Sequence, residues 1–270
     1  MKTRDRWTAL VAAVGALALL VPIRAPAQES GAEVYDAVMD RAEARLEGVD
    51  SVTVIQETTT SMGTSTTQEL HLVKGTRNGR TILLPKGGES GQQAMPPASV
   101  LATGDSVMER SQLRGRSRVD GREVYVVAAP DLSGVEFGQG ALSGTDARSF
   151  EGDSATFYVD TESYVLRRAD IHGRMDMGGR ERAVSLGIHL RDYRETAGYL
   201  HPFRSEIQVE IEGLGEQMQA MMEKMQQAGA DSARRAMMEQ AMGAMLGGGI
   251  TVTSTVTELR VNGRANPNGS

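Results

Sequence analysis

The chain has 270 residues and a formal net charge of −6 at pH 7, with 24% charged and only 4% aromatic residues. The length suits one sizeable domain or two small ones. The absence of cysteine excludes disulfides, thiolate metal sites, cysteine nucleophiles and the lipidation that makes a lipoprotein, and the acidic charge argues against binding to nucleic acid or anionic membranes.

The first 27 residues are typical of a secretory signal peptide. Three basic residues precede an apolar run from Trp7 to Val21, and Ala25-Pro26-Ala27 has the small-x-small pattern of a cleavage site. The run has about 15 residues, fewer than the roughly 20 that cross a bilayer, although an uncleaved anchor is the alternative. We therefore expect 1–27 to be removed and 28–270 to form a single domain of a soluble exported protein.

The first predicted element of that domain is an amphipathic helix over residues 32–47, AEVYDAVMDRAEARLE. Its apolar residues, among them Val34, Val38 and Leu46, fall on one side and its charges on the other. Gly48 provides the stop signal at the C-terminal end.

After the helix the apolar period changes from helical to two, which predicts strands. Val52 and Val54 alternate with polar residues, and so do Leu70 and Leu72. The dipeptides Asn-Gly at 78–79 and Asp-Gly at 120–121 predict tight turns between further strands.

Two segments of this half predict loops instead. Residues 86–98 contain mostly Gly, Gln and Pro with little to bury, and a second glycine-rich stretch covers about 131–149.

The C-terminal half alternates more regularly and predicts five strands. The last of them changes phase before Leu259, which predicts a β-bulge near Thr257. The five predicted segments are 154–160, 164–175, 182–193, 205–213 and 249–263.

These patterns predict an α+β domain with about nine to eleven antiparallel strands in meander order and one N-terminal helix. Clean alternation indicates a sheet with one wet and one covered face, and long antiparallel strands curl into a barrel or half-barrel that packs or holds a ligand. We take the apolar face as concave. The candidate ligand-binding residues are Val52, Val54, Leu70, Leu72, Leu186, Ile188, Ile207 and Val209.

A methionine-rich segment, 213–249, interrupts the last two strands and predicts an inserted helical hairpin of roughly 214–228 and 232–246. Its methionines can pack the two helices together, or form an adaptable lid over the half-barrel, or bind Cu(I) through thioethers. Neither helix contains Cys or His, so we predict no metal site. The candidate lid residues are Met218, Met221, Met222, Met225, Met238, Met242 and Met245.

The sequence offers little for catalysis, and we predict that the chain is not an enzyme and uses no cofactor. Its four histidines are scattered without the spacing of a metal-binding motif. Ser185 lies in AVSLG, a variant of the nucleophile elbow, but within an alternating strand rather than at the strand-to-helix turn that this chemistry needs.

Several short motifs resemble the LolA-like superfamily of exported carriers and sensors. Phe157-Tyr158-Val159-Asp160 followed by Tyr164-Val165-Leu166-Arg167 resembles its strand, Asp-containing turn and strand that returns to an arginine. Asp192-Tyr193-Arg194, with Gly198-Tyr199 and His201-Pro202-Phe203, resembles a second family passage, and Val261-Asn262 its closing strand.

The resemblance implies an unclosed β-barrel with helices in its opening and a periplasmic apolar cavity for acyl chains, typically those of lipoproteins bound for the outer membrane. We therefore expect a non-enzymatic binder or carrier of lipid or lipoprotein acyl chains that meets the membrane only transiently. The competing hypothesis is an envelope sensor or protein-interaction module that docks an envelope protein through the methionine-rich hairpin.

Overall fold

The computed structural model describes residues 30–61, 63–77, 79–86, 110–132, 150–176, 179–215 and 249–265. The predicted signal peptide, the seven candidate lid methionines and nearly all of the two predicted loops lie outside these residues. Those predictions therefore remain predictions.

Helix α1 spans Gly31–Ala44 and begins with a capping box, in which the Ser30 side chain and the Glu33 side chain each bond the other's backbone N–H. The helix ends three residues earlier than the sequence predicts. Leu46 continues the chain in a turn, bonded to the carbonyl of Glu43, and Gly48 follows with a φ of +74°. The left-handed backbone at Gly48 directs the chain into the first strand.

The predicted strands are confirmed, although the strand predicted for 205–213 begins at Tyr199 and the strand predicted for 154–160 begins at Phe150. They are β1 (Ser51–Thr60), β2 (Ser65–Arg77), β3 (Arg80–Pro85), β4 (Gln112–Val119), β5 (Arg122–Ala129), β6 (Phe150–Asp160), β7 (Leu166–Asp176), β8 (Glu181–Thr196), β9 (Tyr199–Ile211), β10 (Ile250–Val261) and β11 (Arg264–Ala265).

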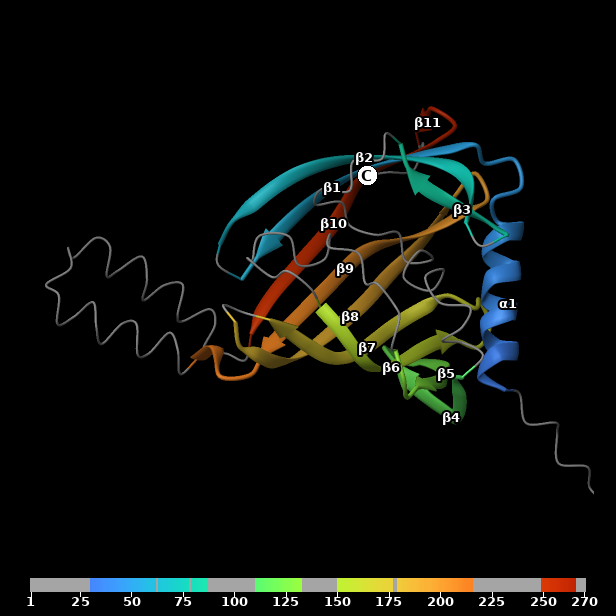
Figure 1. Cartoon of the computed structure of the whole chain (residues 1–270). Coiled ribbons are helices and arrows are strands. Elements are labelled where there is room, and N and C mark those ends of the chain that lie inside the picture. Colours follow the sequence, from blue (N-terminus) through green and yellow to red (C-terminus); the bar gives the residue numbers. More distant parts are fainter. Residues whose placement is uncertain are drawn as a thin grey trace, which may run out of the picture.

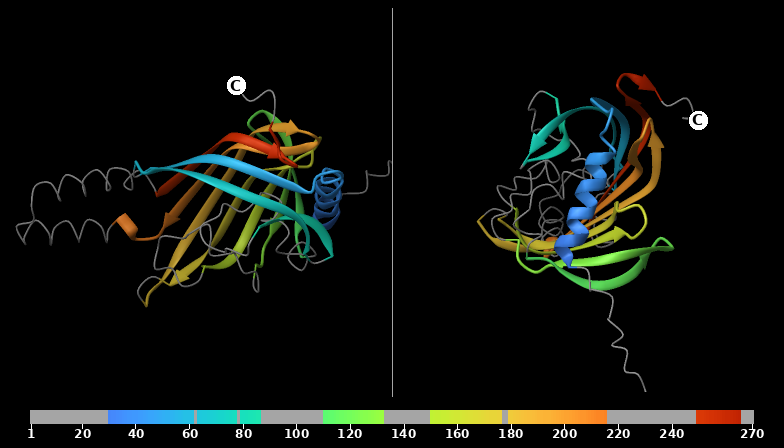
Figure 2. Two further views of the ribbon diagram at one scale, coloured as in Figure 1. Left: turned by 90° about the horizontal axis from the view of Figure 1, so that it is seen from above. Right: turned by 90° about the vertical axis from the view of Figure 1, so that its right-hand side faces the viewer.

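All of these strands form one antiparallel sheet in the order β3-β2-β1-β10-β9-β8-β7-β6-β5-β4, with β11 beside β10. The sheet curls strongly, and its two edge strands, β3 and β4, do not pair with each other (Figures 1 and 2). The predicted half-barrel is therefore confirmed as an unclosed curled sheet. Helix α1 stands across its opening, in contact with β3, β4 and β5 (Figure 1).

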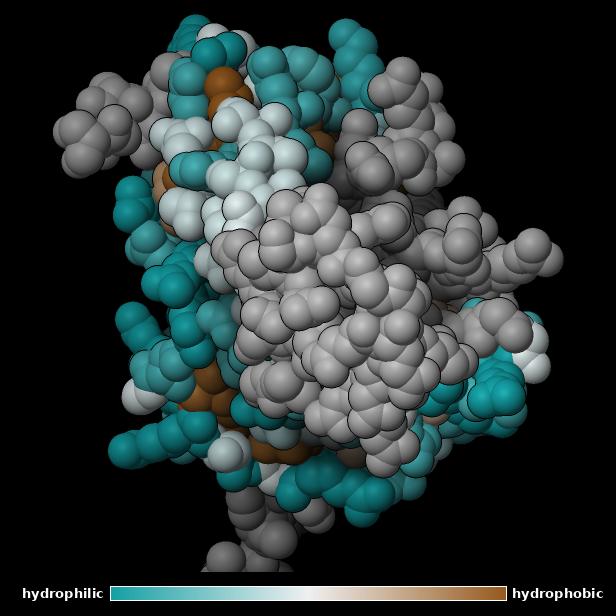
Figure 3. Space-filling view, turned by 90° about the vertical axis from the view of Figure 1, so that its left-hand side faces the viewer, coloured by the Kyte–Doolittle hydropathy of each residue, from teal (hydrophilic) through white to brown (hydrophobic). Residues whose placement is uncertain are grey.

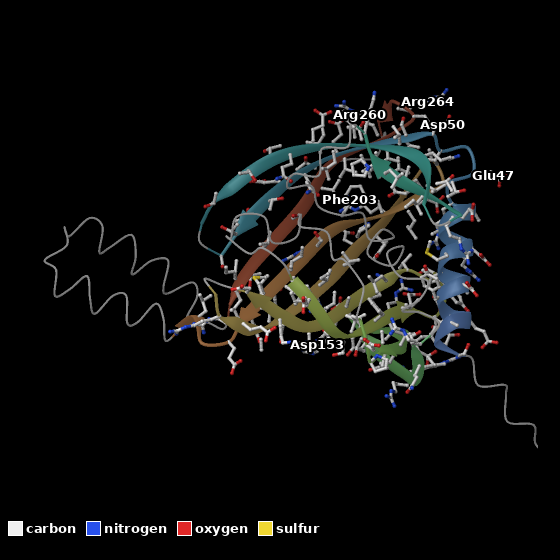
Figure 4. All side chains as sticks on the ribbon, in the orientation of Figure 1. Glu47, Asp50, Asp153, Phe203, Arg260 and Arg264 are labelled. Atoms are coloured by element: carbon white, nitrogen blue, oxygen red, sulfur yellow. The ribbon has the colours of Figure 1, made fainter. Side chains whose placement is uncertain are left out.

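The apolar face of the sheet is the concave one. Phe203 lies on the inner side of the curl, whereas Arg260 and Asp153 lie on the outer side (Figure 4). Since side chains alternate along a strand and paired residues share a face, the pairing register extends this assignment from strand to strand.

The predicted β-bulge at Thr257 is also confirmed. Ile55 pairs with Glu258 and Gln56 pairs with Val256, so Thr257 has no partner opposite it on β1. Its hydroxyl donates to the carbonyl of Ile55 at 3.1 Å. The bulge returns Val256 to the same face as Leu259, which keeps both apolar side chains inside.

The buried side chains form two clusters on this framework. The large cluster joins α1 to the inner faces of β5–β9, and the small cluster joins the α1–β1 connection to β1, β2, β9 and β10. Strand β3 contributes to both, since Leu83 belongs to the small cluster and Ile82 to the large one. Its nearly continuous apolar sequence, RTILLP, is thus explained by burial on both faces.

Candidate functional site

The structure places all eight candidate ligand-binding residues on the concave face. On one side of the curl, Val52 pairs with Leu72 and Val54 with Leu70. On the other side, the residues of β8 pair with those of β9 in the same alternating phase. Six of the eight are buried, whereas Ile188 and Ile207 are half-buried.

Half-buried apolar side chains gather on this face along β8, β9 and β10. Four half-buried isoleucines lie on the neighbouring strands β8, β9 and β10 and pack against the large cluster. Hydrophobic side chains show among hydrophilic ones on the side of the molecule opposite α1 (Figure 3). We call these four residues the isoleucine wall: Ile188, Ile207, Ile211 and Ile250.

A row of neutral polar residues crosses four adjacent strands of the same concave face. The register pairs Gln56 with Gln68, Thr58 with Ser254, and Ser254 with Ser205. The row separates the small cluster from the apolar residues nearer the far ends of β9 and β10. We call it the polar belt: Gln68 on β2, Gln56 and Thr58 on β1, Ser254 on β10 and Ser205 on β9.

Within the polar belt, Gln56 is the member whose side-chain donor lacks a hydrogen-bond acceptor. Gln56 is 5% exposed, and its amide Nε2 has no hydrogen-bond partner among the residues that the structure describes. Thr58 and Ser254, by contrast, bond each other through their hydroxyl oxygens at 2.9 Å. The great majority of buried polar side-chain atoms in proteins are hydrogen-bonded, so the orphan amide is unusual.

The sequence reasoning missed Gln56, although the pattern contained it. Gln56 stands in phase with Val52 and Val54, where the alternation calls for an apolar residue. A polar residue in an apolar phase was the available signal.

A second buried polar group on the concave face is His201, between Tyr199 and Phe203 on β9. The Tyr199 ring stacks on His201 at a centroid distance of 5.7 Å, and Phe203 meets it edge-on at 6.4 Å. Burial lowers the pKa of His201 to about 4 and raises the pKa of Tyr199. His201 is therefore a neutral part of the small cluster near pH 7.

The motifs that suggested the family resemblance hold the structure together near α1. The buried carboxylate of Asp160 accepts from both Nε and Nη2 of Arg167 and from the backbone N–H groups of Glu162 and Ser163. Burial raises the pKa of Asp160, but these hydrogen bonds outweigh it and hold the pKa below its ordinary value.

Two other motif residues have similar structural roles. The buried Tyr193 hydroxyl donates to the carbonyl of Leu166. Asn262 accepts the backbone N–H of Asp50 at 2.7 Å and donates to the carbonyl of Gly48 at 2.7 Å, which ties the end of β10 to the start of β1. The hydrogen bonds at these positions stabilise the fold.

No catalytic constellation appears at the positions that the sequence singled out. Ser185 lies in the middle of β8 on the outer face, where its hydroxyl bonds Nδ1 of His172 at 3.0 Å. The strand is paired on both sides, with β7 and β9, so its backbone N–H groups are committed to the sheet. The described residues also contain no group of three or more His, Asp or Glu side chains that could hold a metal ion.

None of the helices in the described ranges has the length and hydrophobicity that crossing a bilayer requires.

Among solved structures, the chain is similar to a domain from Vibrio parahaemolyticus that is named for outer membrane lipoprotein sorting and to a DUF1329 family protein from Desulfovibrio piger. Each shows 8% identity and a TM-score of 0.44, with 86% of this chain and 92% of the other covered. It is also similar to a LolA superfamily protein from Nitrosomonas europaea, at 12% identity and a TM-score of 0.39, covering 84% of this chain and 93% of that one.

Two of these names agree with the superfamily that the sequence motifs resemble. Because every one of these TM-scores lies below 0.5, no inference about ligand or partner follows from these neighbours. No family model and no curated protein matches the sequence.

Proposed function

We propose that this chain is a non-enzymatic, exported protein that binds or carries lipids or the acyl chains of lipoproteins in its curled sheet. The observation that supports the proposal is the largely apolar concave face, which the polar belt interrupts and which includes the half-buried isoleucine wall. A solvent-exposed apolar surface inside a curl can take up a flexible hydrocarbon chain without dismantling the core.

The energetics of such a ligand suit this surface. Each acyl CH₂ group that leaves water contributes roughly 0.8 kcal/mol, so a chain of about ten buried groups contributes about 8 kcal/mol before the cost of ordering it. The free energy of binding that is left after this ordering cost is small enough for reversible binding, which a carrier needs. The methionine-rich hairpin as an adaptable lid, and periplasmic localisation after signal cleavage, belong to the same proposal.

The direct test is the mass of residues 28–270, purified after export and recorded without denaturation. We expect added mass in lipid-sized increments, with the matching lipid recovered in an organic extract. A bare protein mass, together with no uptake of added lipid by the purified protein, would contradict the proposal.

A pair of variants locates the binding surface. Ile207→Glu places a charge on the isoleucine wall and should reduce binding of a fluorescent fatty acid at least tenfold, because the charge would be desolvated by the bound chain. Gln208→Glu places the same charge on the adjacent, exposed outer-face position and should leave binding unchanged. Equal binding by both variants would move the site elsewhere.

Folding of the first variant needs its own check. If Ile207→Glu fails to fold, Ile207→Trp tests the same position by filling space rather than by charge.

A further inference from the structure

The polar belt has a feature that the burial of plain hydrocarbon leaves unexplained. Its Gln56 side chain points into the concave face beside Val54 and Val256, is 5% exposed, and offers an amide N–H that no residue in the described ranges accepts. We propose that the polar belt is the subsite for the carbonyl of an acyl ester. This inference rests on the proposed function, since it names the class of lipid that the same surface binds.

The position of the polar belt fits a ligand that is polar at one point and apolar on both sides. On β10, Ser254 lies between Val252 and Val256, and on β9, Ser205 lies between Phe203 and Ile207. On β8 and β7 the concave face continues as aliphatic residues. On β9 and β10 a chain lying along this face therefore meets polar side chains at one level, whereas on β1 the polar side continues from Gln56 to Thr58 and Thr60.

The chemistry of the belt selects the kind of polar group. All five members are neutral, so a carboxylate or phosphate bound there would lose its hydration without gaining a cation. An ester carbonyl is neutral and accepts hydrogen bonds without needing to donate any. Of the groups along a glycerolipid, it is the one that matches a buried amide donor.

In the ligand-free protein, the unsatisfied amide of Gln56 has an energetic cost. Leaving a buried donor unsatisfied is destabilising, whereas an apolar side chain of the same shape at that position is neutral or stabilising. Methionine is close to glutamine in length and would suit the neighbouring Val54 and Val256. Glutamine at position 56 is therefore explained if a bound ligand accepts a hydrogen bond from its amide N–H.

The test compares two lipids with matched chains in delipidated protein: dipalmitoylglycerol, which has ester carbonyls, and dihexadecylglycerol, its ether-linked counterpart. Each competes with a fluorescent fatty acid for the protein. We expect the wild-type chain to prefer the ester by about 3- to 10-fold, as one net hydrogen bond gives. Gln56→Met should lose that preference and bind the ether as well as the wild type does.

A matched control is the same substitution on the outer face, Gln208→Met, which should keep the ester preference. Thermal unfolding gives a second readout: delipidated Gln56→Met should unfold at the same or a higher temperature than the wild type. A marked decrease would show that Gln56 has a structural role and would overturn the inference.

The remaining outcomes separate this inference from the proposed function. Equal binding of ester and ether by the wild type, or an ester preference that survives Gln56→Met, overturns the carbonyl subsite and leaves a hydrocarbon carrier. Failure of the wild type to bind either lipid overturns the proposed function itself.

Discussion

The two ends of the concave sheet differ in how deeply their apolar side chains are buried and in how fully their polar side chains are hydrogen-bonded. Near α1, Val52 and Leu259 are each 1% exposed, and Asp160 has four hydrogen bonds. Away from α1, the isoleucine wall is half-buried, and the polar belt between the two ends contains the unpaired amide of Gln56. The difference teaches that one end of the sheet is fully buried and hydrogen-bonded, whereas the other end keeps half-buried apolar side chains that the proposed ligand would cover.

The largest effect that this comparison predicts is at Asp160. Asp160→Ala leaves Arg167, only 14% exposed, and two backbone N–H groups without their acceptor, so we expect a loss of about 3–5 kcal/mol in the free energy of unfolding. Urea unfolding measures it. Asp153→Ala is the control, since its ion pair with Arg174 is about half exposed and should contribute less than about 1 kcal/mol.

A contrary result is easily recognised for this pair. Losses of similar size in the two variants would mean that the Asp160 turn does not stabilise the α1 end.

Two truncations on the same strand, β10, compare how much each end of the sheet contributes to stability. Leu259→Ala removes a fully buried side chain near α1 and should cost about 2–5 kcal/mol, whereas Ile250→Ala, at the half-buried end, should cost about 1 kcal/mol. Ile250→Ala should instead weaken binding of a fluorescent fatty acid. If the two variants lose equal stability, the two ends do not differ as proposed.

A pH dependence follows from His201, which is buried in the small cluster. Its folded pKa of about 4 lies below the ordinary value of 6.5, so the unfolded chain binds the extra proton first as the pH falls. The contribution of this group is complete above about pH 6.5 and is lost as the pH falls toward 4. We expect about 2 kcal/mol less stability at pH 5 than at pH 7 from this group.

Urea unfolding at both pH values, in the wild type and in His201→Phe, isolates that contribution. Burial also lowers the pKa of His189. His189 is present in both the wild type and the His201→Phe variant, and it acts in the same direction as His201. The phenylalanine variant should lose most of the pH dependence between pH 5 and 7. An unchanged dependence would assign it to other groups.

The smallest effect is expected where α1 meets the edge strand β3. Arg80 bonds the exposed carboxylates of Asp36 at 2.8 Å and Asp40 at 2.6 Å. Arg80→Ala should lower stability by about 0.5–1 kcal/mol, and the difference from the wild type should shrink in high salt. A larger, salt-independent loss would show that the arginine stem packs against the helix.

Much of the fold could be predicted because a strand that is buried on one face alternates apolar and polar residues along the sequence. The alternation around Val52 and Leu186 identified the strands and their shared face, and the phase change before Leu259 located the bulge at Thr257. Strand order was harder. The pairing of β1 with β10 depends on contacts between residues about 200 positions apart, which local periodicity does not encode.

The candidate site was predicted only in part for the same reason. The eight apolar positions share the concave face, but nothing in their own pattern shows which are half-buried, because exposure depends on where α1 covers the sheet. Gln56 and His201 were missed as interior polar groups, although both stand in phase with apolar neighbours. A polar residue that fits an apolar phase is thus the informative exception.

The pairing of β1 with β10 also determines when this protein can assemble. In the sheet order, that pair is the link between the β3-β2-β1 segment and the segment from β9 to β4. A chain that emerges N-terminus first must therefore present residue 250 and beyond before its two parts can join into one sheet. Such long-range pairing slows folding. Until then β1 can pair with β2 but not along its other edge, which stays open to proteases and to any chaperone that meets the emerging chain.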